Sequence, residues 1–284
     1  MLRSVDGFAA QGPLLFAHRG APGEHVENTL PAFAAALAHG ADVLELDVHM
    51  SADGHVIVSH DPTGSRVFGV DQAVASSRLA QIKHWSVKGG NGQRYEPATL
   101  SEVLDAFPQV ALNVDVKQGK PDMLVPLFET IMHHAAEERV LLTSFSGRIL
   151  ERIRSFGYMG PLGMSRTDAA LFLLAPRALH GLPRAGSQRL QIPLHQSGLP
   201  LNTRGFVERA HAAGLRVDYW VVNDPAEAER LLDLGADGIV SDDPGRIAEV
   251  FARHVRTRGW RARRAGKADP AALGSKRFNT LIAG

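Results

Sequence analysis

A single closed (β/α)8 barrel is the fold class that this sequence predicts, on the strength of three observations. Short apolar runs alternate with amphipathic segments along the 284-residue chain, a pattern typical of a parallel sheet covered by helices. No Pro/Gly/Ser-rich linker divides the chain in two. The length exceeds that of one small domain and suits a barrel. A doubly wound open sheet is the alternative.

Nine apolar runs compete for the eight strand positions of such a barrel. In chain order they are Leu14–Ala17, Val43–Asp47, Val56–Ser59, Val110–Val116, Arg139–Thr143, Pro161–Met164, Arg189–Ile192, Arg216–Val222 and Gly238–Ser241. We expect either Pro161–Met164 or Arg189–Ile192 to lie outside the barrel.

Helical patterns separate most of these runs. Thr29 is a candidate N-cap, with Pro31 in the first turn, for a helix that ends near Gly40. Further helices are expected at Thr99–Ala106, Asp122–Ala136, Ser146–Phe156, Thr167–Ala175, Asn202–Ala213 and Pro225–Leu234.

Two regions do not follow the alternation. Residues 62–97 lack a clear period, which predicts a small insertion after the third strand. Residues 260–284 are mostly polar and basic, which predicts a loosely held tail. Residues 1–259 are therefore expected to form one barrel domain.

Composition excludes several classes of function. The chain has no cysteine, which rules out disulfides, thiolate metal sites and cysteine nucleophiles. The net charge is +1, so neither nucleic acid nor an anionic membrane surface is an expected partner. The sequence has no secretory pattern and no apolar run long enough for stable membrane insertion, so we expect a cytoplasmic protein.

Barrel enzymes place their active sites at the carboxyl ends of the strands. The first run ends in His18 and Arg19. In the second run, the strand period of two places Glu45 and Asp47 on one face and leucines on the other. Two carboxylates that point into a barrel are costly without a cation. This pair therefore predicts a cation site.

The third and fourth runs add polar groups to the same end. About a dozen residues separate Asp47 from His60, too few for a helical crossover. The segment must turn and come back, which brings His60 to the end that carries Glu45. In the fourth run, the same alternation places Asn113, Asp115 and Lys117 on the inner face.

Together these side chains favour metal-assisted chemistry on a phosphate. Three carboxylates suit Mg²⁺ or Ca²⁺. The cations Arg19 and Lys117 indicate an anionic substrate, and a phosphoryl group fits best. Two histidines beside a metal suit general acid–base cleavage of a P–O bond. Trp220 is expected either at the mouth, against the alcohol part of the substrate, or in the core.

The chain resembles the glycerophosphodiester phosphodiesterase family from Pro13 to about Ile247. The shared motifs include His18-Arg19-Gly20, Glu27-Asn28-Thr29, Glu45-Leu46-Asp47-Val48, Val58-Ser59-His60-Asp61, Trp220-Val221-Val222-Asn223 and Gly238-Ile239-Val240-Ser241-Asp242. The resemblance implies a barrel of the phospholipase C-like phosphodiesterase type. It also implies hydrolysis of a small phosphodiester to sn-glycerol 3-phosphate and an alcohol.

The family pattern also implies roles for individual residues. Metal ligands would be Glu45, Asp47 and Asp115, the acid–base pair would be His18 and His60, and the phosphate contacts would come from Arg19 and Lys117. We assign His18 as the base and His60 as the acid; the nucleophile is either the neighbouring substrate hydroxyl or a water. Glu27 and Asn113 are expected to support the ligands from behind, although Glu27 has a second interpretation, as a charge favouring the next helix N-terminus.

Some positions depart from the family pattern. Asp115 stands where the family has Glu, Val26 where it has Pro, and the insertion lacks the usual Arg-Thr-Thr. One alternative function is the same chemistry on lysophospholipids or another phosphodiester. Another is a non-catalytic barrel that binds phosphodiesters. An amidohydrolase is disfavoured, because the first strand lacks two histidines one residue apart.

Overall fold

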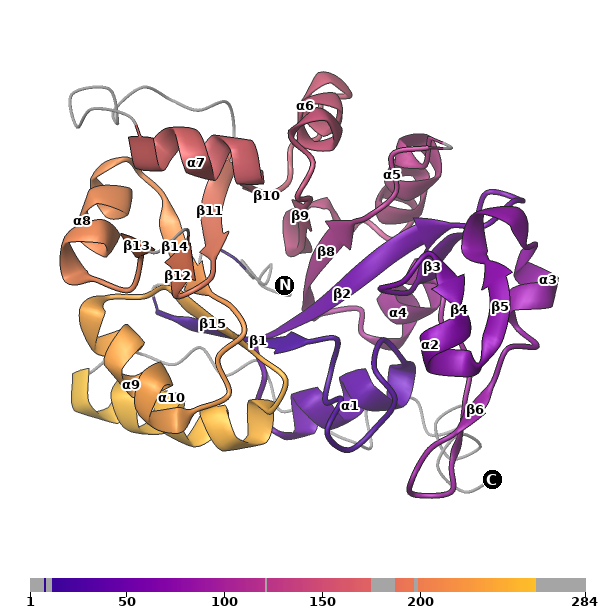
Figure 1. The fold of residues 1–284 in the computed structure, drawn as a ribbon, viewed down its shortest axis with the longest axis horizontal. Helices are drawn as coiled ribbons and strands as arrows, with labels where there is room; N and C mark the ends of the chain where they lie inside the picture. Colours follow the sequence, from indigo (N-terminus) through magenta and orange to yellow (C-terminus); the bar gives the residue numbers. More distant parts are fainter. Residues whose placement is uncertain (1–7, 9–11, 121, 175–186, 197–198, 259–284) are drawn as a thin grey trace, which may run out of the picture.

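A computed structural model of the chain describes residue 8 and residues 12–120, 122–174, 187–196 and 199–258. Its main sheet has nine strands in the order β1-β15-β14-β11-β10-β9-β8-β2-β3, and a further pairing of β1 with β2 closes it. The eight parallel strands form a closed barrel with helices between them, as predicted (Figure 1). They are β1 (Leu14–His18), β2 (Val43–Met50), β8 (Ala111–Val116), β9 (Val140–Thr143), β10 (Leu162–Gly163), β11 (Ser187–Ile192), β14 (Arg216–Tyr219) and β15 (Gly238–Ser241).

The strand outside the barrel is not the predicted one. Both β10 and β11 are barrel strands, so the expectation that one of these two runs lies outside was wrong. The extra strand is β3 (Val56–Val58), which pairs antiparallel with β2 through Val48↔Val58 and Met50↔Val56. The short connection is the physical reason, because it permits a hairpin but no helical crossover. As expected, this return places His60 beside the end of β2.

The predicted helices are present with ends shifted by a few residues. They are α1 (Leu30–Ala38), α4 (Leu100–Ala106), α5 (Leu124–His133), α6 (Gly147–Ser155), α7 (Arg166–Leu174), α8 (Arg204–Ala212) and α9 (Pro225–Leu234), followed by α10 (Pro244–Arg258). Thr99 caps α4 through a hydrogen bond from the Glu102 amide. Thr29 occupies the N-cap position of α1, but the predicted side-chain cap is absent, because its hydroxyl donates to the Val26 carbonyl at 2.6 Å.

Residues 62–97 form an insertion whose first part lies beside β3, while β6 (Val87–Lys88) extends away from it (Figure 1). The insertion comprises β4 (Thr63–Gly64), α2 (Ser65–Phe68), β5 (Val70–Ala73), a 3-10 turn at Val74–Ser76, α3 (Leu79–Ile82), β6 and β7 (Arg94–Tyr95). A small apolar cluster of Ile57, Val74, Ile82 and Trp85 holds it against β3. The predicted tail at 260–284 lies outside the described residues, so the domain division stays a prediction.

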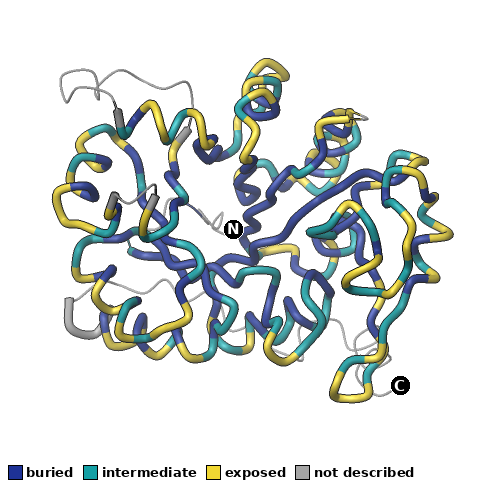
Figure 2. Tube along the Cα trace, viewed as in Figure 1, coloured by how far each residue is buried: buried dark blue, intermediate teal, exposed yellow. Residues whose placement is uncertain are grey.

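Apolar side chains between the strands and the helices form the main core. The strands are buried along their length, whereas the helices expose their outer faces (Figure 2). The inside of the barrel is mixed. A smaller apolar cluster fills one part of it, with Phe16, Val43, Leu141 and Val240 among its members. Buried polar groups line the rest: Glu45, Asp47, Asn113, Asp115, Arg189 and Asp218. None of the helices that the structure describes is long and apolar enough to cross a membrane.

Candidate active site

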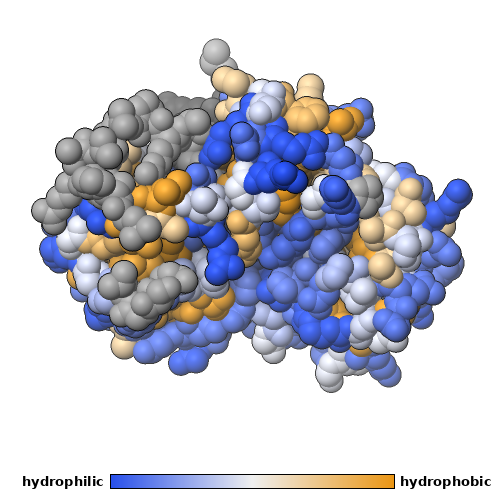
Figure 3. All heavy atoms as spheres, turned by 45° about the horizontal axis from the view of Figure 1, so that its top comes forward, coloured by the Kyte–Doolittle hydropathy of each residue, from blue (hydrophilic) through white to orange (hydrophobic). Residues whose placement is uncertain are grey.

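A cavity of about 770 Å³ opens at the carboxyl ends of the barrel strands. All the predicted site residues except Glu27 line it. One half of the cavity is polar and is formed by the ends of β1, β2 and β8. The other half is largely apolar, with Phe145, Met164, Leu173, Ile192, Leu201 and Val221 in its walls. Figure 3 shows the surface of the molecule, with more hydrophobic side chains among the described residues on the left and more hydrophilic ones in the centre and on the right.

His18 ends β1 and contacts a carboxylate from the far end of the chain. Its Nδ1 lies 2.6 Å from Oδ1 of Asp242, which follows β15, and β15 is the neighbour of β1 in the closed sheet. Asn223 donates to the other carboxylate oxygen of Asp242 at 2.9 Å. Burial lowers the pKa of His18, but the Asp242 hydrogen bond and the charge of Glu45 outweigh it, so the pKa is raised.

His60 contacts a carboxylate in the same manner. Its Nδ1 lies 2.7 Å from Oδ1 of Asp61. Nε of Arg66, in helix α2 of the insertion, donates to Oδ2 of Asp61 at 2.5 Å. The two terminal nitrogens of Arg66 donate to Glu27 at 2.8 and 2.6 Å. The insertion thus connects the loop of His60 with the loop that follows β1.

The three predicted metal-binding carboxylates lie together on two adjacent strands. Glu45 and Asp47 are on the inner face of β2, and the parallel register places Asp115 of β8 directly beside Asp47. Nζ of Lys117 lies 2.6 Å from Oδ2 of Asp115 and 2.9 Å from Oδ1 of Asp47. Nε of Arg19 lies 3.4 Å from Oδ2 of Asp47. Both predicted phosphate-binding cations therefore also neutralise carboxylates.

The charges of these carboxylates are unequal. Burial, together with the nearby charge of Asp47, raises the pKa of Glu45 to about 8. Burial also raises the pKa of Asp115, against the opposing effect of Lys117. The pKa of Asp47 is lowered, because Lys117, Arg19 and a hydrogen bond from Asn28 outweigh its burial. Glu45 is thus the carboxylate whose ionisation most needs a further cation.

The carboxylates of Glu45, Asp47 and Asp115 are ligands that suit a hard dication, although their oxygen atoms do not converge on a single position. Within the described residues no three carboxylate or imidazole groups form a metal-binding cluster. However, Oδ1 of Asp115 and Oδ1 of Asn113 are buried without a hydrogen-bond donor. Two buried oxygens without a donor, next to a carboxyl of raised pKa, are satisfied by a cation. The residues present therefore fit Mg²⁺ or Ca²⁺.

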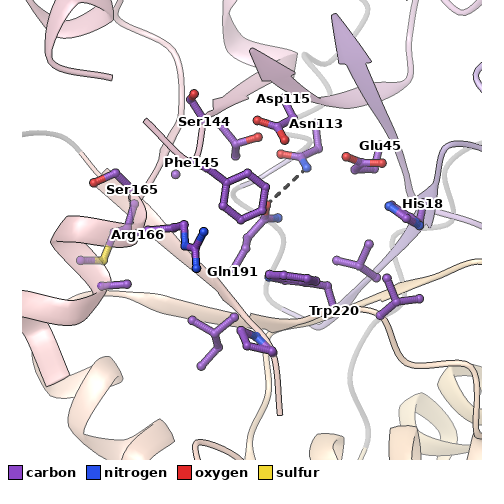
Figure 4. Close-up of a pocket in the computed structure, with 18 of the residues that line it drawn as sticks. His18, Glu45, Asn113, Asp115, Ser144, Phe145, Ser165, Arg166, Gln191 and Trp220 are labelled. Atoms are coloured by element: carbon purple, nitrogen blue, oxygen red, sulfur yellow. Dashed lines mark hydrogen bonds between the residues drawn. The ribbon is translucent and has the colours of Figure 1, made fainter. Parts of the chain in front are cut away.

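Figure 4 shows both sides of the cavity, with His18 and Glu45 on one side and Ser165 and Arg166 on the other. Trp220 follows β14 and meets Phe145 edge to face, with 5.9 Å between the ring centroids. Its partly exposed indole lines the cavity and also packs against the apolar cluster inside the barrel, so both predicted positions apply in part. Asn113 donates to Gln191 at 3.3 Å, and Gln191 donates to the buried Asp218 at 3.3 Å. A chain of polar groups therefore descends from the mouth into the barrel.

Sequence reasoning missed several contributors to this site. Asp242 directly follows the predicted strand Gly238–Ser241, and Asp61 lies two residues after the predicted strand Val56–Ser59, so their positions at strand ends were a usable signal. Arg66 carried no signal, because the insertion has no period from which a contact could be predicted. Glu27 pairs with Arg66 and, at 3.1 Å, with Arg19. It lies in the loop before α1, as both of its interpretations expected.

Residues 18–246 match the Glycerophosphoryl diester phosphodiesterase family. This chain belongs to that family. It is therefore a phosphoric diester hydrolase, and the glycerophosphodiester phosphodiesterase resemblance is confirmed.

Individual relatives agree with this family. A "Probable glycerophosphodiester phosphodiesterase 2" of Mycobacterium tuberculosis is 30% identical, over 87% of this chain and 94% of that protein. A "Lysophospholipase D" of Rattus norvegicus is 27% identical, over 82% of this chain and 84% of that protein. The solved structure of an Oleispira antarctica phosphodiesterase in complex with the product sn-glycerol-3-phosphate is 25% identical. It aligns with a TM-score of 0.70 over 85% of this chain and 97% of that one.

Proposed function

We propose that this phosphodiesterase hydrolyses glycerophosphodiesters to sn-glycerol 3-phosphate and an alcohol, with a divalent metal ion and two histidines. One observation carries the proposal. Two imidazoles, each held by a carboxylate on its Nδ1, line one cavity together with three carboxylates and two cations. The bound product in the Oleispira antarctica relative supports the identity of the product.

The two histidines have the arrangement that acid–base chemistry needs. In each, the carboxylate accepts from Nδ1–H and leaves Nε2 to exchange a proton with the substrate. We assign His18 as the base that takes the proton of the nucleophile, because Asp242 and Glu45 favour its protonated form. His60 then gives a proton to the departing alkoxide. The nucleophile is the neighbouring hydroxyl of the glycerol or a water.

Glu45, Asp47 and Asp115 are the proposed holders of Mg²⁺ or Ca²⁺. When bound, such an ion supplies Lewis-acid stabilisation of negative charge on the phosphoryl group. Arg19 and Lys117 add hydrogen bonds to the same oxygens. Because Asp is shorter than the Glu usual at this place, Asp115 reaches less far into the cavity than the family pattern implies.

Lysophospholipids are a second candidate substrate class. The apolar half of the cavity offers a place for a hydrocarbon chain, and one of the relatives is named a lysophospholipase D. A non-catalytic barrel is not proposed, because every group that the chemistry needs is present.

A substrate panel on the purified protein tests the proposal. We expect release of sn-glycerol 3-phosphate from glycerophosphocholine or a homologue, detected by phosphorus NMR. EDTA should abolish the release, and Mg²⁺ or Ca²⁺ should restore it. His18→Ala and His60→Ala should each lose about 100-fold or more in kcat, whereas the exposed His84→Ala should lose none. Full activity in excess EDTA would contradict the metal proposal.

The roles of the two histidines are separated by the leaving group. A nitrophenolate leaves without a proton, so a nitrophenyl ester does not need a general acid. We expect His60→Ala to lose much less rate on this ester than on the alkyl ester. Equal losses on both esters would overturn the assignment of His60 as the acid. If His18→Ala, and not His60→Ala, kept its rate on the nitrophenyl ester, the two roles would be exchanged.

A further inference from the structure

Arg166 is a cation in the cavity that the chemistry above does not use. It is the first residue of α7 and lines the half of the cavity away from the carboxylates. Figure 4 shows its side chain extending from α7 toward Phe145 and Gln191. Its guanidinium carbon lies 5.8 Å from the centroid of the Phe145 ring. A group bound beside Phe145 therefore meets this positive charge.

The charge of Arg166 is not neutralised by the residues that the structure describes. Arg19 and Lys117 contact carboxylates at 3.1 and 2.6 Å, but no described carboxylate lies within ion-pair distance of Arg166. The neighbouring sequence offers few carboxylates. Between Ser165 and Leu201 the chain has four arginines and one carboxylate, Asp168. Asp168 accepts a hydrogen bond from the Ser165 hydroxyl at 2.9 Å.

The aromatic side chains next to Arg166 do not form a site for a cation. Phe145 and Trp220 lie edge to face, as an aromatic cage for an ammonium group would. However, Nζ of Lys117 lies 5.3 Å from the centroid of Phe145, and Arg166 is the second cation near that ring. Lys117 is paired with Asp47 and Asp115, so the charge of Arg166 decides which headgroup fits. It would repel a choline-like headgroup placed there and attract a negative group.

We propose that Arg166 selects glycerophosphodiesters whose alcohol part carries an anionic group, a carboxylate or a phosphate, and disfavours those with a cationic alcohol. This inference rests on the proposed function, because it places the variable half of that substrate against α7. It is also consistent with the cavity volume of about 770 Å³, which exceeds what a phosphate and a glycerol occupy.

Three synthetic esters of sn-glycerol 3-phosphate test the proposal. Their alcohols are choline, its neutral isostere 3,3-dimethylbutanol, and the anionic 3-hydroxypropionate. All three share a two-carbon spacer, so they differ chiefly in the charge at the far end. We expect kcat/KM of the metal-loaded enzyme to be highest for the carboxylate ester and lowest for the choline ester. The carboxylate and neutral esters should differ by about tenfold.

Substitutions assign this preference to Arg166. Arg166→Gln should lower kcat/KM for the carboxylate ester by about tenfold and leave the neutral ester within about twofold. Arg166→Glu should reverse the order of the charged esters. For each ester, the ratio of kcat/KM between variant and wild type is compared, because the intrinsic reactivity of the ester cancels in this ratio. Arg148→Gln is the matched control, since Arg148 is exposed on α6 and does not line the cavity.

Two results would overturn the proposal: a wild-type enzyme without charge preference, or a preference that survives Arg166→Gln in a variant whose thermal melt shows a folded protein. A failure of the proposed function would be distinguishable from a failure of the Arg166 proposal. In that case none of the three esters is hydrolysed. Calorimetric binding of the same esters to wild type and to Arg166→Gln then decides whether Arg166 recognises the anion.

Discussion

At the scale of single residues, the site is governed by how buried carboxylates obtain a counter-charge. The positive charges of Lys117 and Arg19 and a hydrogen bond from Asn28 stabilise the ionised form of Asp47, so its pKa is lowered. Glu45 lies two positions earlier on the same face of β2, where burial and Asp47 raise its pKa to about 8. The same strand therefore carries one carboxylate that is ionised by the protein and one that needs a further cation. This difference links metal binding to pH.

Metal binding should release a proton from Glu45. The pKa of about 8, above the ordinary 4.5, means that the metal-free protein holds this proton at pH 7. A dication needs the carboxylate, so its affinity should rise with pH, by up to about tenfold per unit below pH 8. Calorimetry of Mg²⁺ or Ca²⁺ binding in buffers of different ionisation enthalpy measures the released proton.

The raised pKa of Glu45 also predicts that the metal-free protein becomes less stable as the pH rises. A carboxyl whose pKa is raised on folding costs stability once the unfolded chain can ionise it. The metal-free protein should thus lose stability between about pH 4.5 and 8, and saturating metal should remove this loss. Glu45→Gln should reduce both effects to the smaller contribution of Asp115, whose pKa is also raised, while the exposed Glu208→Gln should behave as wild type. An affinity for metal that is constant from pH 6 to 8 would contradict the link.

At the scale of elements, the insertion takes part in the site through α2. Arg66 is the residue that does this, since it contacts Asp61 behind His60 and Glu27 behind Arg19. Burial raises the pKa of Glu27, but the two arginines outweigh it, and the pKa is lowered. An insertion whose sequence has no helix or strand period thus holds Asp61, the carboxylate that contacts the proposed acid His60.

Removal of Arg66 should impair the positioning of His60. We expect Arg66→Ala to lower kcat on an alkyl ester by about tenfold or more, with a much smaller loss on a nitrophenyl ester. Added guanidinium should restore part of the rate, because it can replace the lost hydrogen bonds to Asp61 and Glu27. Arg94→Ala, an exposed position on β7 of the same insertion, should have no effect. A uniform loss on both esters, without rescue, would indicate a purely structural role.

At the scale of the whole molecule, closure of the barrel creates a polar interior that no single strand predicts. Arg189 of β11 and Asp218 of β14 form a fully buried ion pair, in which Nε of Arg189 donates to Asp218 at 2.7 Å. Arg189 also donates to the Asp237 carbonyl, just before β15, at 3.2 Å. These contacts tie three neighbouring regions of the sheet together beneath the cavity.

Replacing one partner of this ion pair should destabilise the protein strongly, whereas replacing both partners with apolar residues should not. Arg189→Met leaves the buried Asp218 charge without its partner, so we expect a loss of about 3–5 kcal/mol in the free energy of unfolding. The double variant Arg189→Met/Asp218→Leu should recover most of that loss. Urea unfolding of both variants measures the difference. A double variant no more stable than Arg189→Met would show that the pair has another role.

The basic tail should be dispensable for catalysis. The family match covers residues 18–246, and among the residues that the structure describes, those that line the cavity lie between His18 and Val240. We therefore expect a chain that ends at residue 259 to keep kcat/KM within about twofold on a soluble glycerophosphodiester. A loss greater than tenfold would mean that residues 260–284 contribute to the site.

The sequence alone determined the barrel class, the faces of the strands and the polar groups at its mouth. These properties follow from local periodicity: Glu45 and Asp47 share a face because a strand repeats every two residues. Only the tertiary structure decided which strand lies outside the barrel and which groups hold the histidines. The His18–Asp242 contact joins residues 224 positions apart, and it exists because β15 closes onto β1. The pairing of His18 depends on closure of the barrel, and the contact of Arg66 with Asp61 behind His60 depends on an insertion without a period. Neither contact can be predicted from a local sequence pattern.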